Sequence, residues 1–166
     1  MIVISDTSVI NNLAAIYQLD LLQKLYGSII IPQAVYEELT LPNSWVAGAN
    51  EVQSYDWIKV RSVSNDSLLE SLQQELDIGE SEVIALAIEL KAELILIDER
   101  RARNIAESWN LRYTGILGVL IEAKSQGVIS AVKPLLNSLI NEGGFWIASS
   151  LYKRVLEEVS ENEISN

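Results

Sequence analysis

Short apolar runs recur along the chain at positions where buried strands are expected. Three of them, at residues 2–4, 28–31 and 94–97, are four residues or fewer in apolar length and stop abruptly at a polar residue or a proline. Such runs are typical of parallel strands that helices cover on both faces. Residues 57–60 alternate between apolar and polar, which favours an edge strand or an extended connector. Residues 111–113 favour one more short strand, again parallel.

Apolar residues at helical spacing fill the segments between these runs and continue toward the C-terminus. Gly27 and Gly127 close two of the patterns, and Pro134 lies where the first turn of a helix tolerates it. Strands that alternate with helices in this way are typical of an α/β fold with a parallel sheet. The length of 166 residues fits one domain, residues 1–166.

Carboxylates follow two of the strands and occupy the inward faces of two helices. Asp6 comes directly after the first strand, and Asp98 directly after the run at 94–97. The helices that leave parallel strands begin at the edge where those strands end. Helical periodicity places Glu38 and Glu80 on the same faces as their apolar neighbours. We therefore expect these four carboxylates to meet at one edge of the sheet.

Neighbouring acids leave the register of three of these positions open. The alternatives are Glu37 for the second acid, Glu82 for the third and Glu99 for the fourth. Periodicity places Glu82 together with Glu89 on the opposite side of their helix, which predicts a solvated stripe. Asp77, just before a glycine at a helix start, is explained by capping.

Other polar and aromatic residues near these strand ends have a structural explanation as well as a functional one. Thr7 or Ser8 is expected to cap the helix that follows the first strand. The segment 42–50 is rich in Pro, Asn, Ser and Gly, which predicts a loop or weak helix over the mouth of the site. Trp45 in this loop is suited to stack on a base, but packing against the protein body is the safer expectation.

The composition removes several classes of chemistry. The chain has no cysteine and no histidine, so disulfides, thiolate chemistry, Ser-His-Asp catalysis and histidine-based zinc sites are excluded. The net charge of −11 argues against a surface that coats nucleic acid without specificity. The start of the chain lacks a signal-peptide pattern, and no apolar run has membrane-spanning length, so we expect a cytoplasmic protein with no membrane contact.

A cluster of four carboxylates predicts a metal site. Like charges a few ångströms apart raise each other's pKa, and a divalent cation removes that conflict. Oxygen ligands alone suit Mg²⁺ or Mn²⁺, which can activate a water and stabilise charge on a phosphate, so phosphodiester hydrolysis is the natural reaction. Arg100, Arg101 and Arg103 follow Asp98 and are candidates for phosphate contacts, with a solvated helix face as the alternative.

Four segments in order, VISDTS, IPQAVYEEL, GESEVIALA and LILIDERR, resemble the PIN-domain family of nucleases. The resemblance covers about residues 1–113, the core, and leaves a helical extension at about 114–160 that is similar to an uncharacterised PIN-like branch. It implies a three-layer α/β/α sandwich around a parallel sheet and Mg²⁺- or Mn²⁺-dependent cleavage of single-stranded RNA. By position, the family's catalytic acids and metal ligands would be Asp6, Glu38, Glu80 and Asp98, with Ser8 as a supporting hydroxyl. Glu80 departs from many toxin members, which carry Asp there.

The resemblance leaves several functions open. An endoribonuclease of the toxin type, held silent by a small antitoxin, is the first. A non-catalytic module that keeps the acids as a vestigial or regulatory metal site is the second. A haloacid dehalogenase-type phosphatase fits poorly, because Ser8 replaces the second aspartate of its DxDx[TV] motif, and a receiver domain fits less well still. Apolar helices in the C-terminal part favour a homodimer.

Overall fold

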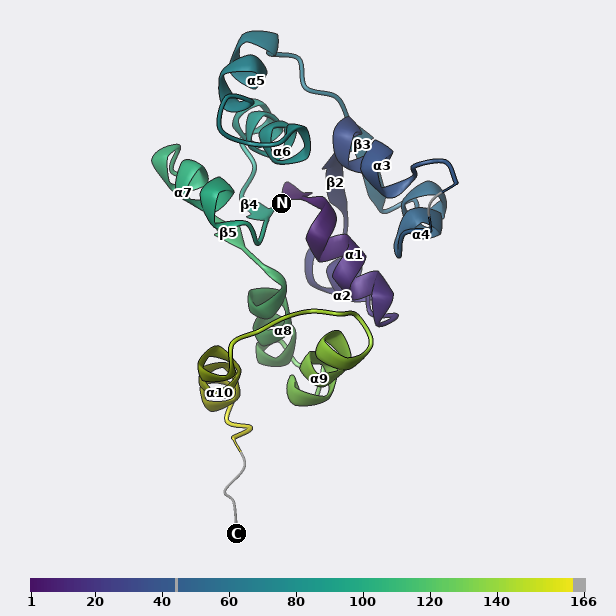
Figure 1. The fold of residues 1–166 in the computed structure, drawn as a ribbon, viewed down its shortest axis with the longest axis vertical. Helices are drawn as coiled ribbons and strands as arrows, with labels where there is room; N and C mark the ends of the chain where they lie inside the picture. The colour runs from purple at the N-terminus through teal and green to yellow at the C-terminus, as the bar shows by residue number, and fades with distance from the viewer. Residues whose placement is uncertain (44, 163–166) are drawn as a thin grey trace.

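Five parallel strands form the centre of the molecule in a computed structural model, which describes residues 1–43 and 45–162 (Figure 1). Each neighbouring pair is parallel, and the spatial order is β3-β2-β1-β4-β5. The strands are β1 Val3–Ser5, β2 Ile29–Pro32, β3 Ile58–Arg61, β4 Leu94–Leu96 and β5 Tyr113–Thr114. All the strands predicted from the sequence are present, and the run at residues 57–60 proves to be an edge strand.

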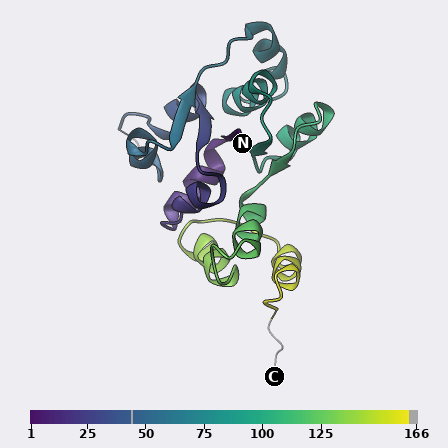
Figure 2. The same cartoon turned by 180° about the vertical axis from the view of Figure 1, so that it is seen from behind.

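Ten helices lie within the described residues. They are α1 Thr7–Ala15, α2 Asp20–Tyr26, α3 Gln33–Leu39, α4 Ala49–Ser54, α5 Asp66–Leu72, α6 Ile78–Leu90, α7 Arg100–Ser108, α8 Ile116–Ser125, α9 Lys133–Asn141 and α10 Ser149–Glu158. Helices α5, α6 and α7 lie on one side of the sheet, and α1, α2 and α8 lie on the other (Figure 1), as the view from behind also shows (Figure 2). The predicted three-layer α/β/α fold is therefore confirmed.

The order of the strands places a crevice at the centre of the sheet. From β1 the chain moves outward through β2 to β3, and it then returns across the sheet to β4 on the other side of β1. Open α/β sheets bind ligands outside the carboxyl ends of the strands at such a reversal. The backbone N–H of Asp6 donates to the carbonyl of Leu96 at 2.9 Å, so the ends of β1 and β4 lie side by side.

Helix α6 is the most deeply buried helix in the described part of the chain. It contacts α3 and α5 as well as three strands, so nearly every side of it is covered. Its side chains from Ser81 to Ala87 are all buried. The prediction of a solvated stripe through Glu82 and Glu89 is wrong for this reason: Glu82 is buried, and Glu89 accepts hydrogen bonds from the backbone N–H groups of Ser64 and Asn65.

The start of α1 also differs from the prediction. Thr7 is the first residue of the helix and Asp6 is its N-cap residue, so neither Thr7 nor Ser8 is the cap. The Thr7 hydroxyl instead donates to Oε2 of Glu38 at 2.9 Å. The Thr7 hydroxyl thus links α1 to α3.

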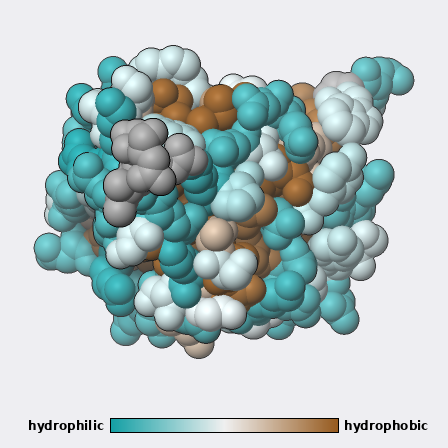
Figure 3. All heavy atoms as spheres, turned by 90° about the horizontal axis from the view of Figure 1, so that it is seen from below, coloured by the Kyte–Doolittle hydropathy of each residue, from teal (hydrophilic) through white to brown (hydrophobic). Residues whose placement is uncertain are grey.

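Helices α8, α9 and α10 form the C-terminal end of the molecule, below the sheet in Figure 1. Apolar residues such as Leu136, Leu139 and Val155 continue the core into this part. Glu161, which follows α10, is bound to the start of α9, because its carboxylate accepts hydrogen bonds from the backbone N–H groups of Val132 and Lys133. Seen from this end, hydrophobic residues reach the surface in patches between hydrophilic ones (Figure 3). No helix in the described part of the chain is long and apolar enough to cross a membrane.

Candidate functional site

A pocket of about 520 Å³ opens at the carboxyl ends of β1 and β4. Strand ends and helix starts from four parts of the chain meet there, as expected for the reversal point of the sheet. Its lining residues are Asp6, Thr7, Ser8, Asn11, Glu38, Asp77, Glu80, Asp98 and Glu99. All four carboxylates that the sequence singled out are thus brought to one pocket, together with Ser8.

Asp6 is the most deeply buried acid of the pocket. Only 9% of its surface is exposed, and no ion pair within the described residues involves it. Burial raises the pKa of the Asp6 carboxyl from 3.8 to about 7, although the Thr7 backbone N–H lowers it. The negative charges of Glu80, Asp77 and Glu38 contribute to this rise in the same direction as burial. Asp6 is therefore a buried carboxyl surrounded by like charges, which is the situation that a cation would relieve.

Gly79 shows how closely these acids approach one another. A Cβ atom built on Gly79 would lie 3.4 Å from Oε2 of Glu38, 3.6 Å from Oδ1 of Asp6 and 3.6 Å from Oδ1 of Asp77. Oxygens from β1, α3 and the start of α6 therefore surround a single point. Glu38 reaches this point although its side chain is solvent-exposed, so it faces the pocket rather than the core.

Glu80 and Asp77 belong to the first turn of α6. Oδ1 of Asp77 accepts a hydrogen bond from the Glu80 backbone N–H at 2.8 Å, so Asp77 caps the helix as expected. The same carboxylate also lines the pocket, which capping alone does not explain. Burial raises the pKa of the half-buried Glu80 carboxyl, and the Asp77 charge raises it as well, while Arg101 acts in the opposite direction.

Asp98 differs from the other acids of the pocket because neighbouring groups donate hydrogen bonds to its carboxylate and fix its position. Its carboxylate accepts hydrogen bonds from the Ile116 backbone N–H and from Nη2 of Arg103 at 3.3 Å. Burial raises the pKa of the Asp98 carboxyl, and the Ile116 N–H and the Arg103 charge lower it. Gly115 makes room for this arrangement, since a Cβ there would lie 2.0 Å from Oδ1 of Asp98 and 2.2 Å from Nη2 of Arg103.

The three arginines of α7 have different surroundings. Arg103 also donates through Nε to the carbonyl of Ile97 at 2.9 Å and lies over the ring of Tyr113, 5.1 Å from its centroid. Its guanidinium therefore braces Asp98, which makes it a poor candidate for a phosphate contact. Arg101 is exposed and donates to the carbonyl of Glu75, and Arg100 is exposed.

The alternative acids lie in other surroundings. Glu37 is exposed and accepts a hydrogen bond from Gln33 on its own helix, outside the pocket. Glu82 is buried away from the pocket, where its Oε1 accepts from the Ala34 backbone N–H at 3.1 Å at the start of α3. Glu99 lines the pocket next to Asp98, but it caps α7 by accepting from the Arg101 backbone N–H.

Several pocket residues were missed or given only a structural role in the sequence. Asp77 was explained by capping, and its i+3 spacing to Glu80 was the signal that both face the same turn. Asn11 lies one helical turn after Ser8 on α1, and this spacing also places it at the pocket. Nothing in the sequence predicts that Arg103 pairs with Asp98. An arginine a few residues after an aspartate is equally compatible with a phosphate contact.

The donor set fits a hard divalent cation, while the arrangement of the side chains is not that of a formed ligand cage. The pocket offers carboxylate and hydroxyl oxygens, the donors that Mg²⁺ and Mn²⁺ prefer. Among the described residues, however, no three acidic side chains converge closely enough to hold an ion as they stand. Binding would therefore require side chains to rotate, and the exposed Glu38 and half-buried Glu80 are the ones with room to do so.

The comparisons with known proteins point to one family. A family model described as a PIN domain matches residues 2–161, nearly the whole chain and well beyond the N-terminal segments that carry the resemblance. No curated protein matches the chain.

Proposed function

The chain belongs to the PIN-domain family, whose members are generally nucleases, and we propose that it is a divalent-metal-dependent endoribonuclease of single-stranded RNA. The observation that carries this proposal is the convergence of Asp6, Glu38, Glu80 and Asp98 on one pocket with a buried, uncompensated carboxyl at its base. A cluster of acids at this edge of an α/β sheet suits phosphoryl chemistry better than any other reaction open to a chain without His or Cys.

Four side chains would hold the metal in this proposal. Asp6 and Asp98 come from the two central strand ends, and Glu38 and Glu80 approach from α3 and α6. A bound Mg²⁺ or Mn²⁺ supplies a water of lowered pKa and charge stabilisation at the scissile phosphate. Asp6 must be deprotonated to act as a ligand, and its pKa of about 7 means that binding releases a proton near neutral pH.

Polar residues around the acids would position them and the substrate. The Thr7 hydroxyl holds Oε2 of Glu38 on the pocket side of α3, and Arg103 holds Oδ1 of Asp98. Ser8 lines the pocket as the supporting hydroxyl. Arg100 and Arg101, exposed on α7 beside the pocket, are the proposed phosphate contacts.

The proposal is tested by cleavage of single-stranded RNA with the purified full chain in Mg²⁺ and in Mn²⁺. We expect Asp6→Asn to lower the cleavage rate at least ~100-fold, because it removes a charged ligand from the metal. Asp56→Asn is the matched control, since Asp56 is an exposed aspartate outside the pocket, and it should retain the wild-type rate.

Metal binding without turnover is the result that contradicts this function. The side chains of the described residues do not form a ligand cage as they stand, which favours that second reading, a PIN-like interaction module with a vestigial metal site. In that case Mg²⁺ or Mn²⁺ would raise the melting temperature of the wild type, and no single-stranded RNA would be cleaved at any metal concentration.

Two finer parts of the proposal concern partner proteins. A toxin-type role silenced by a small antitoxin rests on the resemblance to toxin nucleases. A homodimer rests on the apolar C-terminal helices, whose surface carries hydrophobic patches (Figure 3). A monomeric sedimentation profile at micromolar concentration would contradict the homodimer.

A further inference from the structure

A second hollow lies next to the carboxylate pocket, between the end of α1 and the start of α4. It has a volume of about 280 Å³. We call it the aromatic groove, and its lining residues are Ala14, Ala15, Tyr17, Thr40, Leu41, Trp45, Val46, Ala47, Gly48, Ala49, Asn50, Glu51 and Gln53. Two aromatic side chains at its rim are almost fully exposed, Trp45 at 89% and Tyr17 at 90%.

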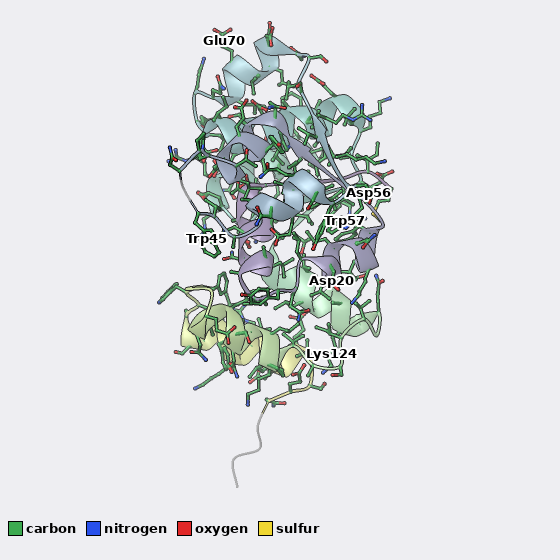
Figure 4. All side chains as sticks on the ribbon, turned by 90° about the vertical axis from the view of Figure 1, so that its right-hand side faces the viewer. Asp20, Trp45, Asp56, Trp57, Glu70 and Lys124 are labelled. Carbon is green, nitrogen blue, oxygen red and sulfur yellow. The ribbon has the colours of Figure 1, made fainter. Side chains whose placement is uncertain are left out.

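The exposure of Trp45 contradicts the expectation that it packs against the protein body. Trp57 shows what a packed tryptophan looks like in this chain: it is buried, and its ring stacks on Tyr55 with centroids 5.5 Å apart. Figure 4 shows Trp45 at the margin of the molecule, on the opposite side of the view from Trp57. The face of the Trp45 ring is therefore available to a planar partner.

Helix α1 connects the aromatic groove to the carboxylate pocket. Its first residues, Thr7 and Ser8, line the pocket, and its last residues, Ala14 and Ala15, line the groove. The two sites are thus about 10 Å apart along the helix axis. Asn11, halfway along, lines the pocket and donates from Nδ2 to the carbonyl of Ala47 in the groove at 3.0 Å.

The loop that forms the groove is fixed tightly against α1. Gly48 adopts a φ of +101°, a left-handed conformation that favours glycine, and a Cβ there would lie 3.1 Å from Cγ2 of Ile10. The close approach at Gly48 and the Asn11–Ala47 hydrogen bond place the loop against the same helix whose first turns line the pocket. A chain of nucleotides entering one site would therefore run past the other.

The chemistry of the lining fits a base better than a phosphate. No Lys or Arg lines the groove in the described part of the chain, and Glu51 adds a negative charge. A phosphate would be repelled there, whereas a neutral, planar base can stack on an aromatic ring. Asn50, Glu51 and Gln53 offer hydrogen-bonding groups for the edge of a base. Two exposed arginines, Arg100 and Arg101, lie instead at the start of α7, which follows Glu99 of the carboxylate pocket.

A second copy of this chain fits the groove less well. The chain carries a net charge of −11, so a second copy would bring like charge to a groove that already contains Glu51. The small volume and the many polar residues of the lining also differ from the continuous apolar groove that an amphipathic helix requires.

We propose that the aromatic groove is a base-binding subsite, in which Trp45 stacks on a nucleobase of the single-stranded RNA that lies next to the scissile nucleotide. The inference rests on the proposed nuclease function for its substrate class. Tyr17, also almost fully exposed, lines the same groove. Substrate affinity would then come from base stacking at one end of α1 and from the cation that the acids would hold at the other.

The test measures binding of a short, 5′-fluorescein-labelled single-stranded RNA by fluorescence anisotropy. It is carried out with the full chain in an Asp6→Asn background with Mg²⁺, so that the RNA stays intact. We expect Trp45→Ala to raise the Kd roughly 10-fold, since stacking on one base is worth that much, and Trp45→Phe to restore most of the affinity. Trp146→Ala is the matched control, because Trp146 is also a highly exposed tryptophan but lies outside the groove.

A series of RNAs with one abasic nucleotide at successive positions identifies the base. One abasic position should cost the Trp45-containing protein the same roughly 10-fold, and it should cost the Trp45→Ala protein nothing further. Unchanged affinity of Trp45→Ala, or an equal loss at every abasic position, overturns the subsite. So does a Trp45→Ala protein that dissociates from a dimer in sedimentation while its RNA affinity is unchanged, because the groove would then bind a protein.

Cleavage assays with wild-type Asp6 separate this inference from the proposed function. A chain that binds RNA through Trp45 but cleaves none retains the subsite and fails as a nuclease. A chain that cleaves RNA with the same KM before and after Trp45→Ala is a nuclease without this subsite. A chain that binds no RNA at all overturns both.

Discussion

The two sides of the carboxylate pocket handle negative charge in different ways. We call Asp6, Glu38, Asp77 and Glu80 the open rim, and Asp98 with Arg103, Gly115 and Ile116 the braced rim. On the braced rim a guanidinium and a backbone N–H compensate one aspartate. On the open rim four carboxylates face one another, and no ion pair in the described part of the chain relieves them.

The difference separates the part of the site whose side chains are held in place from the part whose charges are not neutralised. Arg103 and the Ile116 N–H offset part of the cost of burying Asp98 and fix the position of its carboxylate, so this side of the pocket is held in place before any cation binds. The open rim carries an electrostatic cost in the folded protein, and a bound cation would remove it. The open rim is therefore where metal affinity and pH dependence should arise.

The largest expected effect is the pH dependence of stability that Asp6 causes. Its folded pKa of about 7 lies above the unfolded value of 3.8, so the fold favours the protonated form. Stability is then fully present below about pH 4 and is lost as the pH rises from there through 7, by about 4 kcal/mol in total. Urea unfolding of the wild type at pH 5 and pH 8, without metal, should show a large part of this loss.

Asp6→Asn provides the comparison for this prediction. The amide does not ionise, so the variant should lose much less stability between pH 5 and pH 8 and should be the more stable protein at pH 8. Addition of Mg²⁺ or Mn²⁺ at pH 8 should raise the stability of the wild type and leave the variant nearly unchanged. Parallel pH curves for the two proteins would show that the open rim is not strained.

The second prediction compares the same added methyl group on the two rims. Gly115→Ala would place Cβ 2.0 Å from Oδ1 of Asp98 and must displace the ion pair with Arg103, so we expect a loss of about 2–3 kcal/mol. Gly79→Ala would place Cβ at ordinary contact distances, 3.4 Å or more, within the first turn of α6. It should be neutral or stabilising, because alanine favours a helix over glycine.

Thermal or urea unfolding of both variants measures this difference. Any residue can adopt the backbone conformation of Gly115, which has a φ of −116°. Backbone strain therefore does not contribute to the loss of stability measured for Gly115→Ala. Equal stability of the two variants would mean that the side chains of the braced rim accommodate an added methyl group as easily as those of the open rim. In that case Asp98 is not held by its surroundings.

Periodicity along the sequence predicts which strand ends and helices contribute to this site. It does not predict the burial or the partners of a side chain where contacts between distant segments determine them. Strand ends and helix faces lead Asp6, Glu38, Glu80 and Asp98 to one edge of the sheet, and all four line one pocket there, although Glu38 is exposed and not on the buried face that periodicity predicts. Glu82 was placed on a solvated face, because one helical wheel cannot reveal that α3 covers that side. The bracing of Asp98 also depends on a remote segment, the turn at Gly115 and Ile116.

Trp45 and Asp77 show a second limit of sequence interpretation. In both cases the common structural role was preferred, packing for Trp45 and capping for Asp77. Asp77 does cap α6 and lines the pocket as well, whereas Trp45 does not pack. Burial depends on what covers a loop in the folded chain, and the composition of residues 42–50 carries no information about that.

The third prediction concerns Glu82, a buried carboxylate outside the pocket that fixes the helix carrying Glu38. Glu82 accepts a hydrogen bond from the Ala34 backbone N–H and so fixes the start of α3, the helix that carries Glu38. Glu82→Ala leaves a buried N–H without its acceptor, so we expect a loss of about 2 kcal/mol. Glu82→Gln retains an acceptor oxygen at the same place and should lose less.

Glu89→Ala is the control that separates stability from positioning. Glu89 also accepts from backbone N–H groups, those of Ser64 and Asn65 before α5, and neither α5 nor Glu89 lines the pocket. Both alanine variants should lower the urea midpoint by comparable amounts. Only Glu82→Ala should also raise the Mn²⁺ concentration needed for half-maximal thermal stabilisation, because Glu82 anchors α3, which carries Glu38 of the open rim, whereas Glu89 anchors the segment before α5, which carries no member of the rim. Equal metal dependence of the two variants would show that Glu38 does not need a fixed α3 to serve the pocket.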